Sequence, residues 1–396
     1  MSNLLGGLPT QEPDKIIGLM HQFAADPRPQ KIDLGVGVYR TEDGKTPIMR
    51  AVKEAERRLL DQQDTKGYVA LSGDPAFRAA MADLVLGPDL PADLVAALAT
   101  PGGTGAVRQG LELAVRANAD ATVWLSAPTW PNHWSIAEAM GLPVRVYRYY
   151  DSATGQLDQS GMMADLDGAR AGDIVLLHGC CHNPTGADLA SQDWQSLSDL
   201  CVRRGLIPLV DLAYQGLGKG VAEDVAGLRQ MSTALPEMLI AASGSKSFGL
   251  YRERVGVLLA ICANPSAKQR TAETMDWLNR LNYAFPPDHG ARLVTMILSD
   301  PDLRQAWESE LSGMRNRLHQ LRLALVQALR DETGGTDFDF IASQQGMFSL
   351  LGATPEQVVT LRETHGVYMV GDSRINVAGL TEMTIPIAAH AIAAVL

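Results

Sequence analysis

The chain has 396 residues, with 45 acidic and 34 basic side chains and a net charge of −11. A negative field of this size repels polyanions, which argues against a nucleic acid partner, and an anionic substrate would have to be held by a few local arginines. The length exceeds the usual size of one hydrophobic core, and 46% of the residues are apolar. We therefore expect two lobes that share an interface rather than an isolated binding module.

The cysteine count and the apolar runs indicate the compartment. The chain has only four cysteines, Cys180, Cys181, Cys201 and Cys262, which favours reduced thiols in a reducing environment. Residues 1–13 lack the basic and apolar regions of a secretion signal. The longest apolar runs, such as residues 255–262, are much shorter than the roughly 18–20 residues that span a bilayer. We expect a cytoplasmic protein with no membrane partner.

Short apolar runs bounded by polar or turn residues predict buried strands. These runs cover residues 123–125, 174–177, 206–210, 239–242 and 255–262. Helical spacing appears between them in two apolar sets: Val107, Leu111, Ala114 and Val115, and Trp194, Leu197, Leu200 and Cys201. The alternation predicts an α/β fold with a mostly parallel sheet, helices on both faces, and a ligand at the carboxyl ends of the strands.

The end of the chain has a different pattern. Residues 302–331 have a charged helical pattern with one apolar stripe. This predicted helix could connect the large lobe to the rest of the chain. An apolar run at 346–350, a helical pattern at 355–365 and a strand-like run at 374–377 follow. These elements predict a smaller α+β lobe, packed closely against the first because no Gly/Ser linker intervenes.

One lysine follows a predicted buried strand. Lys246 lies in the segment Ser243-Gly244-Ser245-Lys246-Ser247, with Arg252 and Arg254 shortly after it. A lone lysine here could simply be an exposed loop residue. Partial burial beside a cation, however, lowers the pKa of an amine and lets it react with a carbonyl, while hydroxyls and a guanidinium can hold a phosphate. The segment predicts the anchor of an aldehyde cofactor.

A carboxylate ends the preceding predicted strand. Asp211 and Tyr214 follow residues 206–210, where an Asp without a cationic partner would be costly. Asp211 could keep a bound pyridine nitrogen protonated while the Tyr214 phenol bonds the ring oxygen. The alternative is an Asp that caps a helix beside a packed Tyr.

The segment His178-Gly179-Cys180-Cys181-His182 invites a metal interpretation, which we reject. Adjacent cysteines cannot easily face one ion, and no second Cys/His pair at zinc spacing occurs elsewhere. Cysteine after a buried strand commonly fills core space. The following Asn183-Pro184-Thr185-Gly186 predicts a turn that directs the Asn183 amide toward the site.

Two further segments could contact a cofactor, although each is weak evidence by itself. Pro101-Gly102-Gly103-Thr104-Gly105 runs into a helical pattern, and its backbone N–H groups could hold a phosphate, although such a run is often only a turn. Trp130 follows the strand at 123–125 and could stack on a flat cofactor or fill the core.

Together these segments resemble the class I aminotransferases that use pyridoxal 5'-phosphate, in particular the aspartate and aromatic amino acid aminotransferases of bacteria. The resemblance covers nearly the whole chain. It rests on ordered motifs: Leu34 to Tyr39, the Gly102–Gly105 turn, Pro128 to His133, His178 to Gly186, Asp211 to Tyr214, the Lys246 segment, and Arg374 to Gly379. It implies fold type I, with an N-terminal arm at 1–12, a small domain at 13–45 and 312–396, and a large cofactor-binding domain at 46–311.

The resemblance also implies a role for each matching residue. Lys246 would carry the cofactor as a Schiff base and then move the substrate proton. The catalytic set would be Lys246, Asp211, Tyr214 and Trp130, with His133 supporting Asp211. Cofactor binding would involve Gly103, Thr104, Trp130, Asn183, Asp211, Tyr214, Ser243, Ser245, Lys246 and Arg254, with Tyr68 from a neighbouring subunit. Substrate binding would involve Gly37, Trp130, Asn183, Arg280, Phe348 and Arg374, and no metal is expected.

Shared sites of this kind imply a homodimer that acts on amino acids and 2-oxo acids. Arg280 resembles the arginine that reaches a side-chain carboxylate across the dimer, and the segment around Ile16 and Ile17 would line the entrance. Gly244 and Ser247 depart from the family pattern, which leaves local packing and cofactor affinity open. Phe285 is bulky and apolar where some aspartate-preferring relatives carry a small polar residue.

The sequence therefore predicts an aromatic amino acid aminotransferase that uses 2-oxoglutarate as acceptor in a ping-pong cycle and also accepts aspartate. Three alternatives stay open. They are an aspartate aminotransferase with minor aromatic activity, a pyridoxal-phosphate-dependent lyase, and a non-catalytic binding protein that keeps the fold.

Overall fold

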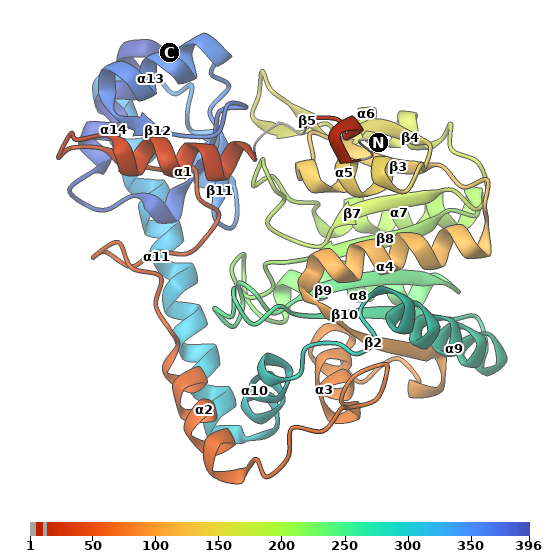
Figure 1. Ribbon diagram of the computed structural model, residues 1–396. Coiled ribbons are helices and arrows are strands. Elements are labelled where there is room, and N and C mark those ends of the chain that lie inside the picture. Colours follow the sequence, from red (N-terminus) through yellow and green to blue (C-terminus); the bar gives the residue numbers. More distant parts are fainter. Residues whose placement is uncertain (1–4, 11–13) are drawn as a thin grey trace.

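The computed structural model describes residues 5–10 and 14–396, which form a large and a small lobe joined by one long helix (Figure 1). Of the predicted N-terminal arm at 1–12, residues 1–4 and 11–12 lie outside the described residues, and η1 (Leu5–Gly7) is a short 3-10 helix. Among the described helices, none has the length and apolar character needed to cross a membrane.

The large lobe contains a seven-stranded sheet with the order β2-β10-β9-β8-β7-β3-β4. Its strands are β2 (Val95–Pro101), β3 (Val123–Ala127), β4 (Val144–Arg148), β7 (Ile174–His178), β8 (Ile207–Leu212), β9 (Met238–Ser243) and β10 (Val255–Ile261). The ladders β4-β3-β7-β8-β9 are all parallel. The predicted α/β class with a mostly parallel sheet is confirmed.

One strand runs against the expected direction. The run at 255–262 forms β10, which is antiparallel to both β9 and β2. The reason is the short connection after β9, since residues 244–254 contain no crossover helix and the chain can only turn back. This reversal places the Lys246 loop between two adjacent strands.

The sheet separates two cores because successive strand side chains point to opposite faces. Leu176 packs in one apolar cluster and Leu177 in the other. The helices around the sheet are α3 (Pro75–Leu86), α4 (Gly102–Ala117), α5 (Pro131–Ala139), α6 (Gln159–Leu166), α7 (Ser191–Arg204), α8 (Ala226–Ala234), α9 (Pro265–Asn282) and α10 (His289–Ser299). The prediction of helices on both faces holds, and α7 ends at Gly205 in the left-handed region, as its pattern indicated.

Helix α11 (Pro301–Thr333) connects the lobes. Figure 1 shows it running from α2 (Arg50–Gln62) and α10 up to the small lobe. Leu318 belongs to the large-lobe core and Leu321 to the small-lobe core, so the helix changes core within one turn. The domain boundaries at 45/46 and 311/312 stay a prediction.

The small lobe is built from short elements. It holds β1 (Ile32–Asp33) parallel to β12 (Val367–Tyr368), and β11 (Phe348–Leu350) antiparallel to β13 (Arg374–Asn376). Its helices are α1 (Lys15–Ala25), α12 (Phe340–Ser343), α13 (Pro355–His365) and α14 (Ile385–Val395). A small hairpin of the large lobe, β5 (Tyr150–Asp151) and β6 (Gln156–Leu157), reaches toward it.

Candidate active site

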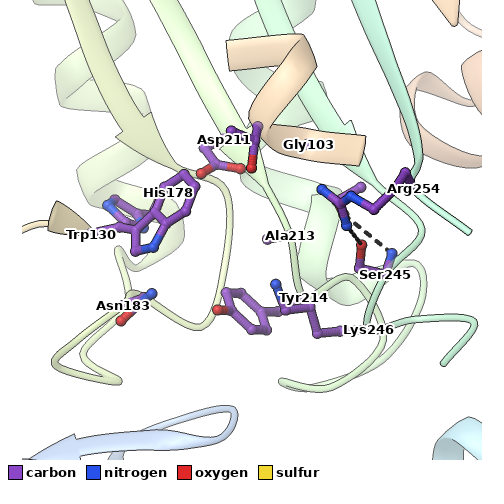
Figure 2. A pocket seen from close by; sticks show the side chains of 12 residues that line it. Gly103, Trp130, His178, Asn183, Asp211, Ala213, Tyr214, Ser245, Lys246 and Arg254 are labelled. Carbon is purple, nitrogen blue, oxygen red and sulfur yellow. Dashed lines mark hydrogen bonds between the residues drawn. The ribbon is translucent and has the colours of Figure 1, made fainter. Parts of the chain in front are cut away.

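A pocket opens at the carboxyl edge of the parallel strands (Figure 2). Ten of the residues predicted from the sequence line it: Gly103, Thr104, Trp130, Asn183, Asp211, Tyr214, Ser243, Ser245, Lys246 and Arg254. They come from the ends of β2, β3, β7, β8, β9 and the start of β10. This convergence follows from the topology, because parallel strands bring their carboxyl ends to one edge.

Lys246 lies in the loop after β9 and is half-buried. Its Nζ lies 5.2 Å from the centroid of the Tyr214 ring. Burial lowers the pKa of the amine below its ordinary 10.5; the Asp211 carboxylate opposes this effect, and the Arg254 and Arg374 guanidinium groups add to it. A larger share of the amine is therefore uncharged near neutral pH than for an exposed lysine.

Asp211 lies within β8 and is buried, so the alternative that it caps a helix is wrong. Its Oδ2 lies 3.0 Å from Nε2 of the fully buried His133. The network continues from His133 Nδ1 to Thr129 Oγ1 (2.8 Å) and from there to His178 Nε2 (3.1 Å). Burial lowers the pKa of His178 to about 3, so that imidazole is neutral near pH 7. The network holds the carboxylate in one orientation.

One end of the pocket is suited to an anion. Arg254 donates from Nη1 to Ser245 Oγ at 3.2 Å, and α4 begins at Gly102. Gly102 has φ +71°, and a Cβ there would lie 2.2 Å from Arg254 Nη2. Glycine thus leaves room for the guanidinium beside the helix N-terminus, where N–H groups and the helix dipole favour a phosphate.

The two departures from the family pattern are accommodated next to this end. A Cβ on Gly244 would lie 3.2 Å from Val255 Cβ, so a larger side chain would press on β10. Ser247 is buried and donates from Oγ to the Gln215 carbonyl at 2.8 Å, while its own carbonyl accepts from Trp307 Nε1 of α11. Both residues pack locally without entering the pocket lining.

The small lobe supplies a second guanidinium. Arg374 is buried and donates to Asn183 Oδ1 and to the Gly35 carbonyl, each at 3.1 Å. Its Nε has no partner among the described residues, and burial lowers its pKa. The Phe348 ring centroid lies 4.4 Å from the Arg374 guanidinium carbon, and a Cβ on Gly37 would lie 3.3 Å from Phe348 Cζ. Arg374 therefore keeps free donor capacity between the lobes.

Another predicted group lies apart from the pocket lining. The Tyr68 and Phe285 rings stack at 4.6 Å, and the Arg280 guanidinium carbon lies 6.0 Å from the Phe285 centroid. Tyr68 is 87% exposed and Arg280 is exposed as well. Ile17, at the start of α1, is also largely exposed. These side chains do not complete the Lys246 pocket within one chain.

Sequence reasoning gave no role to two residues that line the pocket, His178 and Ala213. The available signal for His178 was its position at the end of a predicted strand. Contrary to the expectation that adjacent cysteines cannot face one ion, the thiols of Cys180 and Cys181 and an Asp224 oxygen lie within 4.8 Å of one another. Yet Asp224 already accepts four backbone N–H groups, and the hydrogen bond that the Cys180 thiol shares with Cys181, together with burial, raises the pKa of Cys180. The absence of a metal stays a prediction.

A family model described as aminotransferase class I and II matches residues 29–392. The chain belongs to this family. Its predicted identity as a class I pyridoxal-phosphate-dependent aminotransferase is thereby confirmed, and with it the predicted enzyme class and fold type.

Relatives of the aminotransferase include proteins named for aromatic amino acids and proteins named for aspartate. The aromatic-amino-acid aminotransferase of Paracoccus denitrificans is 54% identical over 389 residues, which cover 98% of this chain and 99% of that protein. The aspartate aminotransferase of Escherichia coli strain K12 is 45% identical over 386 residues, covering 97% and 98%. A solved aromatic-amino-acid aminotransferase from Burkholderia pseudomallei, covalently bound to pyridoxal phosphate, is 41% identical with a TM-score of 0.97 and 100% coverage of both chains.

The charges around Lys246 predict how its titration responds to substitution. In the aminotransferase without cofactor, the Lys246 amine should titrate below 10.5. Asp211→Asn should lower the midpoint further because it removes a stabilising negative charge, and Arg374→Met should raise it. The pH dependence of acetylation at Lys246, followed by peptide mapping, measures this midpoint. A midpoint at or above 10.5, or a rise in Asp211→Asn, would contradict the proposed effect of burial and of these charges on Lys246.

Proposed function

We propose that the protein transfers the amino group of phenylalanine, tyrosine or tryptophan, and also of aspartate, to 2-oxoglutarate in a ping-pong cycle. The observation that carries the proposal is the single pocket that joins a half-buried lysine, a buried carboxylate and an arginine-hydroxyl cradle. The aromatic-amino-acid names of the 54% identical relative and of the solved structures support the choice of donor.

The pocket residues fit pyridoxal phosphate, which when bound supplies a carbonyl that takes up the amino group and a ring that withdraws electrons. Arg254, Ser243 and Ser245, with the amides at the start of α4, would hold its phosphate. Asp211 would accept the N–H of the ring nitrogen, and Asn183 and Tyr214 would bond the ring oxygen. Trp130, at the rim beside His133, would stack on the ring.

Lys246 would attach the cofactor and then act as the base at the substrate Cα. Its lowered pKa suits this task, because the efficiency of a general base is greatest when its pKa lies near the working pH. Arg374 would hold the substrate α-carboxylate through its unused donors. Gly37, which has no side chain, would let the backbone approach the same carboxylate closely. The Phe348 ring packs against Arg374, where it would exclude water from that contact.

The group of Tyr68, Arg280 and Phe285, in which Tyr68 and Arg280 are exposed, supports a homodimer with shared sites. We propose that Tyr68 reaches the phosphate of the neighbouring subunit and that Arg280 binds the side-chain carboxylate of aspartate or 2-oxoglutarate there. The stacked Tyr68 and Phe285 rings would give an aromatic substrate an apolar edge. A location in the cytoplasm fits the four free, buried cysteines.

Three rivals make different predictions. An aspartate aminotransferase with minor aromatic activity is favoured by the relatives of that name at 45% identity. A lyase would release pyruvate or ammonia without an oxo-acid acceptor. A binding protein would need neither the buried Asp211–His133 network nor the lowered pKa of Lys246.

The values of kcat/KM for L-phenylalanine and L-aspartate, with 2-oxoglutarate as acceptor, test which amino acid is the preferred amino donor. We expect phenylalanine to equal or exceed aspartate. Arg280→Ala should lower the aspartate value on the order of 10- to 100-fold, since a charge-assisted contact is lost, and change the phenylalanine value much less. Arg270→Ala, an exposed arginine on the same helix, is the control and should change neither. A large preference of the wild type for aspartate would overturn the aromatic assignment.

Mixing two defective variants tests the shared site. Lys246→Ala should be inactive and Arg280→Ala should be poor with aspartate. If each site takes Lys246 and Arg280 from different subunits, half of the randomly reassembled dimers are hybrids and each has one intact site of two. About a quarter of the wild-type aspartate activity should then return. Activity that stays at the average of the unmixed variants would show that both residues act within one subunit.

A further inference from the structure

Arg322 is a buried cation with no carboxylate partner. It lies in α11 just beyond the point where the helix changes core, and only 1% of its surface is exposed. Among the described residues, no acidic side chain forms an ion pair with Arg322 within 4.0 Å. Arg304, Arg317 and Arg330 of the same helix, in contrast, each pair with an acidic side chain. A charge in this position needs full hydrogen bonding, because an unpaired ion in the interior is costly.

Its hydrogen bonds all go to one short segment. The guanidinium donates to the carbonyls of Ile341 (3.2 Å), Gln345 (3.2 Å), Gly346 (2.9 Å) and Phe348 (2.6 Å), and to Ser349 Oγ (2.6 Å). Five acceptors within residues 341–349 surround one planar fork, while Nε has no partner. Burial lowers the pKa of Arg322 to about 10, which leaves it charged near pH 7. The contacts fasten this segment to α11.

Residues 341–349 contain Phe348, which lines the proposed substrate site. Phe348, whose carbonyl Arg322 holds, places its ring over the Arg374 guanidinium and against Gly37. In the β11–β13 ladder, Leu350 is opposite Arg374 and Phe348 is opposite Asn376. Asn376 in turn donates to the carbonyls of Val36 and Val38, on either side of Gly37. A shift of β11 would therefore move both the ring and the strand that carries Arg374.

The same segment contacts the large lobe at two points. Ser349 Oγ donates to Gln344 Oε1 at 2.6 Å, and Gln344 Nε2 donates to the Gly155 carbonyl of the β5–β6 connection at 3.3 Å. The Gln345 N–H donates to the Gly186 carbonyl at 2.7 Å. Gly186 has φ +70°, and a Cβ there would lie 2.4 Å from the Phe348 carbonyl. Gly186 ends the turn that holds Asn183, the partner of Arg374.

We propose that Arg322 is a positioning residue for the substrate α-carboxylate. By holding residues 341–349 against α11, it keeps Phe348 and Arg374 in register with each other and with the Asn183 turn. It touches neither the cofactor pocket nor the substrate. The proposal rests on the function proposed above, in which Arg374 binds that carboxylate.

Two substitutions separate positioning from simple stability. Arg322→Lys keeps the charge but loses the planar fork, and Arg322→Met keeps only length. Both holoenzymes should show a KM for L-phenylalanine and an inhibition constant for 3-phenylpropionate raised on the order of tenfold, since small misplacements of a clamp weaken binding strongly. The kcat should fall much less, and cofactor absorbance should be unchanged.

Two comparisons complete the test. Arg330→Lys and Arg330→Met, at an exposed arginine of the same helix that pairs with Asp339, should leave both constants at wild-type values. Free guanidinium at a non-denaturing concentration should lower the KM of Arg322→Ala, but not that of Arg330→Ala. If Arg322→Met fails to fold, Arg322→Lys decides together with Ser349→Ala, which removes one acceptor and should raise the KM in the same direction by a smaller factor.

The outcomes distinguish the two proposals. A wild-type protein that transfers no amino group from any donor would end the proposed function. An active wild type whose Arg322→Lys and Ser349→Ala variants keep the wild-type KM and inhibition constant would overturn the role of Arg322, even if their melting temperatures fall. Loss of cofactor absorbance in Arg322→Lys would overturn it too, because the effect would then lie in the other pocket.

Discussion

The site depends on an imbalance of charge at the edge of one sheet. The Arg254 and Arg374 guanidinium groups and the buried Asp211 carboxylate all act electrostatically on the Lys246 amine. Water screens such charges poorly in a partly buried pocket, so the cluster is costly unless anions enter it. A cofactor phosphate and a substrate carboxylate are the two anions that the proposed function brings. The net charge of −11 makes this local concentration of cations stand out.

The strand topology and the contact between the lobes bring these charged side chains together. Parallel strands bring Asn183, Asp211 and Lys246 to the same edge, and the reversal of β10 adds Arg254 beside them. Arg374 comes from the other lobe, where the short β11–β13 ladder carries it. Helix α11 sets the distance between these parts, since Trp307 fastens it to the loop of Lys246 and Arg322 fastens it to the segment of Phe348. The proposed substrate site therefore depends on the contact between the lobes as much as on either lobe.

Much of this could be predicted from the sequence because short apolar runs mark buried strands, and polar residues that follow them must lie at the ligand edge. Lys246, Asp211 and Asn183 were found in that way. The antiparallel direction of β10 was missed, since an apolar run has no direction, and β2 was not singled out. Arg322 was invisible because one arginine among the leucines of a charged helix is expected to face solvent. The separation of Tyr68 and Arg280 from the pocket can be seen only in space, and their place in a dimer needs a second chain.

Borohydride reduction of the purified holoenzyme, followed by peptide mapping, tests whether Lys246 carries the cofactor. We expect one phosphopyridoxyl group, carried by the peptide that contains Lys246, and its loss in Arg254→Met preparations that no longer retain the phosphate. A stable adduct on another lysine, or a catalytically active protein with no adduct, would contradict the assignment of this pocket as the active site.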